Sequence, residues 1–209
     1  MFANRYAVPE LERLAREGRV VAFDTETTGL APRDEICQLA AVEYVAGKEA
    51  RTFVRHLRVD RPMSDAAFRT HGISPEFLAA HGVAPAEALR EFLAFLGEGA
   101  LLVAHNLPFD MGMLRSACSR AGVPFDPGAV ETCDTLALAR RLLPGRKSYA
   151  LGDLLADLGA EGVNSHDALD DSRACGNVLL GMVGLNQRPA PGDWISSSAA
   201  EGGRRGRRR

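Results

Sequence analysis

The sequence contains no apolar stretch long enough to cross a lipid bilayer, which takes about 20 consecutive apolar residues. Its first ten residues, MFANRYAVPE, also lack the apolar core of a signal peptide. Cysteine is sparse, and the four thiols have no paired spacing: Cys37, Cys118, Cys133 and Cys175. We therefore expect a cytoplasmic protein with buried free thiols, without a disulfide framework and without a cysteine zinc site.

The sequence also has no excess of positive charge. The formal net charge is −2 and the pI about 6.2. This balance argues against a protein that depends on non-specific affinity for duplex nucleic acid, which needs many phosphate contacts. It does not exclude an enzyme that grips a short strand end, because metal ions held by carboxylates would reverse the local sign of the field.

What is present suits one soluble domain with a short appendage. The chain has 209 residues, of which 46% are hydrophobic and 25% charged. We predict a domain over residues 1–187 and a disordered tail over residues 188–209, because the tail is rich in Pro, Gly, Ser and Arg and cannot bury a core. The only tryptophan, Trp194, lies in this tail. It is either a docking point for a partner or one of the isolated apolar residues common in tails.

Hydrophobic periodicity predicts three strands in a meander, followed by strands that alternate with helices. The expected strands cover residues 20–23, 35–46, 49–57, 101–104 and 130–133. The expected helices cover residues 9–16, 84–96, 108–121, 135–143, 149–158 and 168–185, with short helical turns over 64–80. The short connection at residues 47–48 indicates an antiparallel hairpin. This order predicts an α/β fold in which helices flank a mixed sheet.

Two carboxylates follow the first buried strand at alternate positions. Side chains two residues apart along a strand point to the same face, as Asp24 and Glu26 would. Against an apolar strand they would repel each other and lose hydration unless a cation lay between them. All-oxygen ligands favour magnesium or manganese over zinc. The pair alone is equally compatible with a strand that has ended and two acids in a solvated loop.

A third acid, Asp110, lies in the first turn of the helix expected over residues 108–121. Pro108 fits the start of that helix. Asp110 shares a helix face with Leu114 and Ala117, and this face must pack inward. However, the helix macrodipole favours an acid in the first turn of any helix, so Asp110 alone does not define a site.

The last expected helix opens on another acidic group, NSHDALDD, at residues 164–171. Asp171 falls on the apolar stripe of the helix, whereas Asp170 lies about 100° around it, towards solvent. Asp171 is therefore the preferred ligand candidate, with Asp167 as the alternative. His166 stands just before the helix, where a neutral imidazole can serve as a general base near pH 7. A lone histidine at such a position is more often a cap or a surface residue.

Taken together, three motifs resemble a known family. DTETTG at residues 24–29, HNLPFD at 105–110 and HDALDD at 166–171 resemble the DEDDh exonucleases in order and separation. They are most similar to the epsilon-type (DnaQ-like) proofreading subunits of bacterial DNA polymerase III. The resemblance covers about residues 19–185 and includes a His-Gly-Ile segment at 71–73. The His-x-Ala-x-x-Asp spacing of the third motif indicates the histidine subclass.

The resemblance implies a ribonuclease-H-like fold with a mixed five-stranded sheet flanked by helices. It implies that Asp24, Glu26, Asp110 and Asp171 hold two magnesium (or manganese) ions. It also assigns the role of general base to His166.

The resemblance further implies four contacts with the 3′ nucleotide. Thr25 would act through its backbone and Leu30 as a wedge against the terminal base, while Asn106 and Phe109 would line the substrate groove. The tail departs from the family, because it shows no clear glutamine-plus-aromatic clamp-binding motif. Direct attachment to a sliding clamp is therefore not implied.

The expected activity is a metal-dependent 3′→5′ exonuclease that releases nucleoside 5′-monophosphates from single-stranded or frayed DNA. Its role would be proofreading or repair, with a DNA polymerase subunit as a candidate partner and no membrane association. The motifs do not separate the two sugars, because the 2′-OH is read by residues outside them. An exoribonuclease, similar to ribonuclease T or oligoribonuclease, therefore stays an alternative. Two further alternatives are a non-catalytic polymerase accessory subunit and a hydrolase of free nucleotides.

Overall fold

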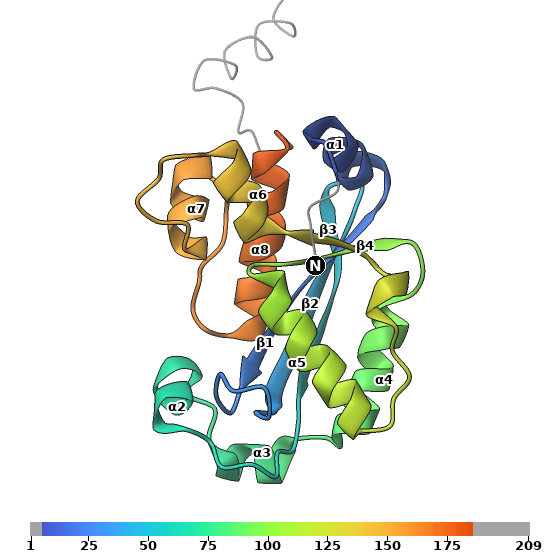
Figure 1. Ribbon diagram of the computed structural model, residues 1–209, viewed down its shortest axis with the longest axis vertical. Coiled ribbons are helices and arrows are strands. Elements are labelled where there is room, and N and C mark those ends of the chain that lie inside the picture. The colour runs from blue at the N-terminus through green and yellow to red at the C-terminus, as the bar shows by residue number, and fades with distance from the viewer. Residues whose placement is uncertain (1–5, 186–209) are drawn as a thin grey trace, which may run out of the picture.

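The computed structural model describes residues 6–185 and shows one mixed sheet with helices on both faces (Figure 1). The sheet has five strands in the order β3-β2-β1-β4-β5. Their bounds are β1 (Arg19–Thr27), β2 (Ile36–Val45), β3 (Lys48–His56), β4 (Ala100–Ala104) and β5 (Glu131–Asp134). β2 pairs antiparallel with β1 and β3, whereas β4 pairs parallel with β1 and β5. The predicted fold class is confirmed.

The helices follow the predicted order. Their bounds are α1 (Val8–Glu17), α2 (Asp65–His71), α3 (Pro75–His81), α4 (Pro85–Leu96), α5 (Leu107–Arg120), α6 (Thr135–Leu142), α7 (Leu151–Leu158) and α8 (Ala168–Met182). The turns expected over residues 64–80 are the two short helices α2 and α3, whose N-termini are capped by the hydroxyls of Ser64 and Ser74. Among the described helices, none combines the length and the apolar composition needed to cross a membrane.

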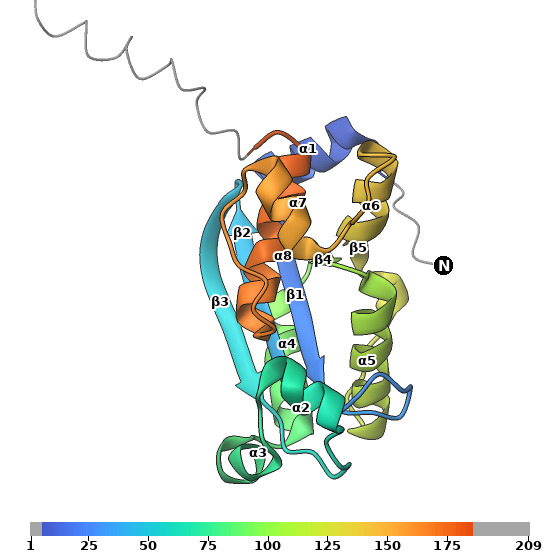
Figure 2. The same cartoon turned by 90° about the vertical axis from the view of Figure 1, so that its left-hand side faces the viewer.

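The sheet separates two hydrophobic cores, and the alternation of β1 decides which side chain enters which core. Val21 and Phe23 join the core under α4 and α5, while Val20 and Ala22 join the core under α7 and α8. Figure 2 shows α7 and α8 in front of the sheet and β1 running behind them towards α2. Continuing the same alternation, the side chains of residues 24 and 26 lie on the α8 face, beside the start of that helix.

β1 differs from the expected strand, which ended at residue 23. The apolar pattern stops there, but pairing with β2 continues through Asp24, opposite Ala40, and Glu26, opposite Gln38. Glu26 is only 9% exposed. The two acids therefore lie within the strand, and the alternative of a solvated loop is wrong.

The hairpin between β2 and β3 is present, but its turn lies one residue earlier than predicted. Ala46 and Gly47 form the two-residue connection and both have positive φ values, 51° and 74°. All four cysteines are buried free thiols, as predicted. The expected domain boundary at residue 187 and the tail with Trp194 lie outside the described residues.

Candidate active site

The structure brings the predicted acids together where β1 passes the starts of α5 and α8. Glu26, Asp171 and His166 offer ligand atoms that all lie within 4.8 Å of one another. Asp24 belongs to the same cluster, because the charges of Asp110, Glu26 and Asp171 all act on its carboxyl group. Glu26, Asp110 and Asp171 are buried, and Asp24 is partly buried. Three distant segments thus place four acids and one histidine in one cluster.

The pKa values of these acids show how unfavourable their charges are in the protein alone. Burial raises the pKa of Asp24 well above its usual range, and the charges of its neighbours raise it further. Burial, followed by the charges of Asp171 and Asp110, raises the pKa of Glu26 to about 8. Burial also raises the pKa of Asp110 to about 7 and that of Asp171 above its ordinary value, although hydrogen bonds partly oppose both shifts.

Only the charge of His166, which lowers the pKa of Asp171, opposes these shifts among the described cationic side chains near the cluster. Among residues 6–185, no arginine or lysine forms an ion pair with Asp24, Glu26, Asp110 or Asp171. A buried group of like charges without a counter-ion is stable in its ionised form only when a cation binds it. Because the donors are carboxylate oxygens with one imidazole beside them, the site fits a hard divalent cation such as magnesium or manganese.

Asp110 is held in place by Thr25. The Thr25 hydroxyl donates a hydrogen bond to Asp110 Oδ1 at 2.7 Å, and the Thr25 backbone N–H donates to the same oxygen at 3.2 Å. The predicted inward orientation of Asp110 is confirmed, since its exposed fraction is 3%. The backbone N–H of Thr25 is thus used by Asp110, and the expected contact of the Thr25 backbone with the 3′ nucleotide stays a prediction.

The start of α8 presents Asp171 and His166 to the cluster. Asp171 Oδ1 accepts a hydrogen bond from the Ser165 N–H at 3.0 Å, whereas Asp170 pairs with the hydroxyl of Ser165 at the surface. Of the two adjacent acids, Asp171 is the one that faces the cluster, as the apolar stripe predicted. His166 is exposed and has a φ of 58°, a left-handed conformation that is uncommon outside glycine.

A residue that we did not predict, Gln38, fixes this segment from β2. Its side-chain nitrogen donates to Asp167 Oδ2 at 2.8 Å, and its side-chain oxygen accepts from the Ala168 N–H at 3.0 Å. Asp167, the alternative ligand, thereby serves as the cap of α8, bonding the Leu169 N–H through its other oxygen at 3.0 Å. The signal in the sequence was an amide in a mostly apolar strand, on the face that Val42 and Tyr44 share.

The other expected substrate contacts lie in or next to the elements that carry the acids, β1 and α5. Leu30 follows β1 and is 85% exposed, so its side chain is free to meet a base. Asn106 is exposed at the N-terminus of α5 with a φ of 71°, and its N–H donates to Asp134 Oδ1 at 3.1 Å. Phe109 is half-buried against the core under α4 and α5.

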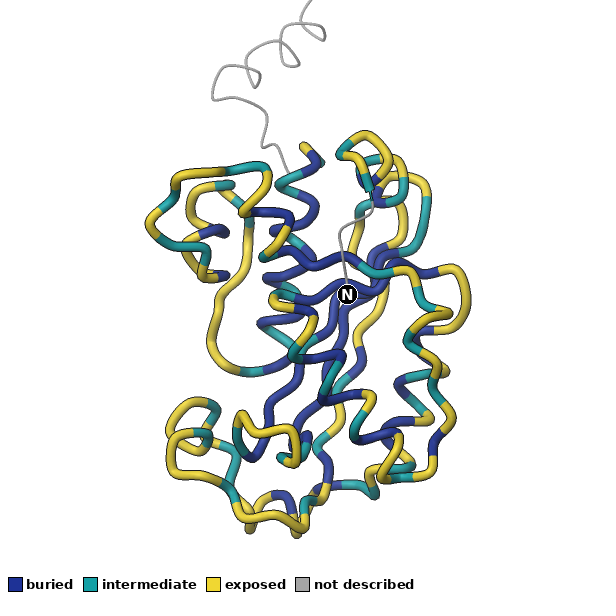
Figure 3. Tube along the Cα trace, in the orientation of Figure 1, coloured by how far each residue is buried: buried dark blue, intermediate teal, exposed yellow. Residues whose placement is uncertain are grey.

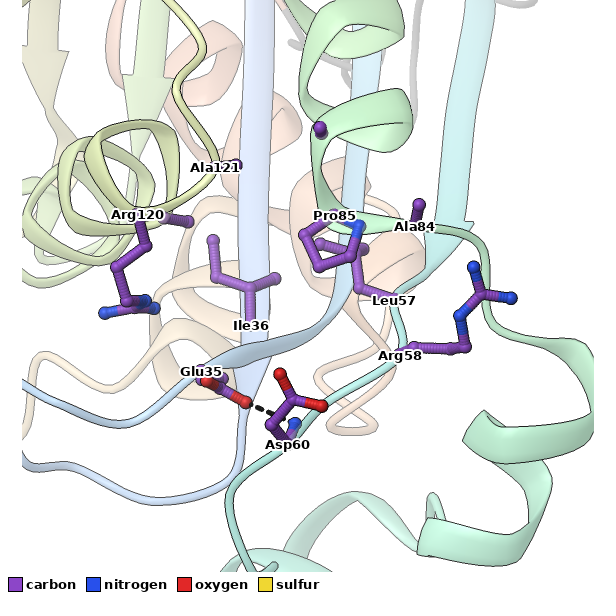
Figure 4. A pocket seen from close by; sticks show the side chains of 11 residues that line it. Glu35, Ile36, Leu57, Arg58, Asp60, Ala84, Pro85, Arg120 and Ala121 are labelled. Carbon is purple, nitrogen blue, oxygen red and sulfur yellow. Dashed lines mark hydrogen bonds between the residues drawn. The ribbon is translucent and has the colours of Figure 1, made fainter.

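A cavity of about 300 Å³ lies away from the acids, at the edge of the core between the sheet, α4 and α5 (Figure 4). Glu35, Arg58, Asp60 and Arg120 supply its charged side chains, and Glu35 accepts a hydrogen bond from the Asp60 N–H at 2.8 Å. None of the predicted site residues lines it. The candidate active site is therefore the open acid cluster and not this cavity.

Residues 21–179 match the family described as Exonuclease, so the chain belongs to the exonuclease family. Over 168 residues it is 36% identical to a DNA polymerase III PolC-type protein of Halalkalibacterium halodurans, covering 80% of this chain and 11% of that protein. It is 37% identical to a DNA polymerase III subunit epsilon-like protein of Rhodobacter capsulatus, covering 78% of this chain and 23% of that protein. It is 32% identical to the 3′-5′ exonuclease DinG of Bacillus subtilis, covering 83% of this chain and 18% of that protein. The resemblance to exonucleases found in the motifs is confirmed, although the chain spans less than a quarter of each of these relatives.

Solved structures agree on the fold. A structure of exonuclease I superposes with a TM-score of 0.68 at 24% identity, covering 78% of this chain and 40% of the other. E. coli exonuclease I in complex with a dA16 oligonucleotide gives a TM-score of 0.67 at 23% identity, with the same coverage. The five-stranded ribonuclease-H-like architecture that the motifs implied is thus confirmed.

Proposed function

We propose that this chain is a magnesium-dependent 3′→5′ exonuclease that releases nucleoside 5′-monophosphates from the 3′ end of single-stranded or frayed DNA. The convergence of Asp24, Glu26, Asp110, Asp171 and His166 is the observation that carries the proposal. Within the exonuclease family this set of residues suits hydrolysis of a phosphodiester assisted by metal ions. Residues 1–187 would form the nuclease domain.

In this mechanism the four acids hold two divalent ions, with manganese able to replace magnesium. When bound, the ions supply activation of the attacking water and stabilisation of the departing 3′ oxygen. Asp24, whose carboxyl group feels the charges of the other three acids, would hold these ions together with Glu26, Asp110 and Asp171. His166 takes the proton from the attacking water. Leu30 would press against the terminal base.

Charge removal at Asp24 tests the proposal. Asp24→Asn should abolish the release of mononucleotides from a single-stranded oligonucleotide in magnesium while leaving the circular dichroism spectrum unchanged. His166→Ala should lose most of the rate and keep its affinity for manganese, measured by calorimetry. Undiminished turnover by Asp24→Asn would refute the assignment, and a collapse of manganese affinity in His166→Ala would make that residue a ligand.

The two adjacent aspartates of α8 offer a matched control. Asp171→Asn removes a carboxylate that faces the cluster, so turnover should fall by orders of magnitude. Asp170→Asn removes a carboxylate that pairs with Ser165 at the surface, so turnover should stay within about twofold of wild type. Equal losses in both variants would indicate a general defect of the helix instead of a lost ligand.

The names of the relatives favour DNA over RNA and a place in proofreading or repair. Two of them are DNA polymerase III proteins, which makes a DNA polymerase subunit a candidate partner, and we place the protein in the cytoplasm with its substrate. Matched single-stranded DNA and RNA oligomers digested side by side test the sugar preference, and faster digestion of RNA would overturn it. Co-purification with a stoichiometric polymerase subunit would support proofreading.

A further inference from the structure

A row of side chains runs from the acid cluster across the sheet. Glu26 on β1 pairs with Gln38 on β2, and Gln38 pairs with His56 on β3. Residues paired across neighbouring strands project to the same face of the sheet. His56 therefore lies on the α8 face two strand spacings, about 10 Å, from Glu26.

The pKa of His56 also indicates that this side chain lies near the start of α8. Burial lowers this pKa, while the carboxylate of Asp167, beside the start of α8, raises it. The imidazole thus lies within electrostatic reach of the segment that carries His166 and Asp171.

Beyond β3, two more rings continue this row to the surface. The ring of His56 meets Phe77 of α3 edge to face, with centroids 4.9 Å apart and planes at 82°. Phe77 in turn meets the ring of His81, again at 4.9 Å. Figures 1 and 3 show α2 and α3 at the end of the molecule that β1 points towards, with most of their turns exposed.

Phe77 is a large apolar side chain that is partly exposed to solvent. Its exposed fraction is 41%, although its neighbour Leu78 is buried at 1% and already anchors α3 to the protein. A large apolar ring gains free energy when it is covered, and a ring flanked by two imidazoles presents an aromatic face with polar edges. Nucleobases have the same character, and they stack on such rings without regard to sequence.

We propose that Phe77, flanked by His56 and His81, stacks against a base of the substrate strand upstream of the nucleotide being removed. The inference rests on the proposed function, because a strand whose 3′ end lies at the acids must leave the cluster along some surface. The rings reach the surface on the same face of the sheet as Glu26, beyond Gln38, whose side chain is buried at 2% and bonded to the start of α8. Stacking on Phe77, away from the acids that hold the 3′ end, would keep the strand bound between successive cleavages without selecting its sequence.

Substrate length separates this role from catalysis. The p-nitrophenyl ester of thymidine 5′-monophosphate reaches only the acid cluster, whereas a single-stranded oligothymidylate also reaches Phe77. For Phe77→Ala we expect KM for the oligothymidylate to rise about tenfold with kcat for the ester unchanged. Phe77→Trp, which keeps an aromatic face, should keep a KM close to wild type. Phe77→Leu, which keeps only apolar bulk, should behave like the alanine variant.

Val45→Ala is the control, because Val45 is similarly exposed, at 44%, and lies at the opposite end of β2 from Gln38. It should change neither substrate's kinetics. An unchanged oligothymidylate KM in Phe77→Ala would overturn the proposal, as would parallel losses on the ester and the oligomer. Loss of polymerase-subunit binding with unchanged KM would make Phe77 a protein contact and would also overturn it. Failure of the wild-type protein to degrade oligothymidylate would instead refute the proposed function.

Discussion

The acid cluster should make the free energy of unfolding of the metal-free protein depend on pH. The variant Glu26→Gln isolates the part of this dependence that comes from Glu26. Burial and the neighbouring acids raise the pKa of Glu26 from 4.5 to about 8. Between these two pH values the folded protein keeps a proton that the unfolded chain has already lost. The contribution of Glu26 to the free energy of unfolding therefore falls as pH rises through this window and levels off above about pH 8.

The size of the loss follows from the pKa. A group that is protonated only in the folded state costs about 1.4 kcal/mol for each pH unit. From about pH 6 to about pH 8, wild type should lose about 2 kcal/mol relative to Glu26→Gln, because the loss tapers near the folded-state pKa. In a protein of this size the Tm difference between the two should change by roughly 4–8 °C. Burial also lowers the pKa values of His56, His71 and His105, but both proteins contain these histidines, so their contribution cancels in the comparison.

Thermal unfolding of both proteins in EDTA, and again in excess magnesium, measures the difference. In EDTA the Tm of wild type should fall towards pH 8 relative to Glu26→Gln. Magnesium should stabilise wild type more at pH 8 than at pH 6, because binding favours the ionised carboxylates and releases protons. Parallel Tm curves for the two proteins in EDTA would refute the reasoning, since Glu26 would then titrate normally in the folded state.

Two other substitutions probe the fold around the site. Gln38→Leu removes both bonds to residues 167–168, so we expect a loss of about 1–3 kcal/mol in the free energy of unfolding and a larger drop in kcat than rise in KM. Urea titration and oligonucleotide kinetics test this, and unchanged kcat would contradict a positioning role. Gly176→Ala would place a Cβ 2.3 Å from the Tyr44 ring and should cost about 1–3 kcal/mol. Gly112→Ala, with nothing within 4 Å, should stabilise by up to about 1 kcal/mol, and a larger loss there than at Gly176 would contradict the packing argument.

Local patterns predicted the acids well because each one obeys a rule of a few residues. The two-residue spacing of Asp24 and Glu26 requires only the alternation of a strand. The choice of Asp171 over Asp170 requires only the apolar stripe of α8, and the structure places the two side chains accordingly. The short connection between β2 and β3 predicted their antiparallel pairing, whereas the position of β4 beside β1 could not be inferred, because β4 follows β3 in the chain.

Contacts between distant segments were not predictable in this way. Gln38 bonds Asp167 from 129 residues away, and Thr25 bonds Asp110 from 85 residues away. No local periodicity encodes which side chain meets which across such a distance. The predicted end of β1 was wrong for the same reason. Pairing with β2, and not hydrophobicity, extends the strand through Asp24 and Glu26.

The backbone around the acids suggests how one fold tolerates so much buried negative charge. Among the described non-glycine residues with positive φ, Asn106 (71°) and His166 (58°) lie at or just before the starts of the two helices that carry Asp110 and Asp171. Such conformations cost about 1–3 kcal/mol and persist when surrounding contacts enforce them. These bends direct both helix N-termini to the cluster, where the macrodipoles favour negative charge. The helix ends offset only part of the repulsion, since the pKa values of Asp110 and Asp171 stay raised. A divalent cation would neutralise the repulsion that remains among the carboxylates. This repulsion therefore both destabilises the metal-free cluster and gives it its affinity for metal.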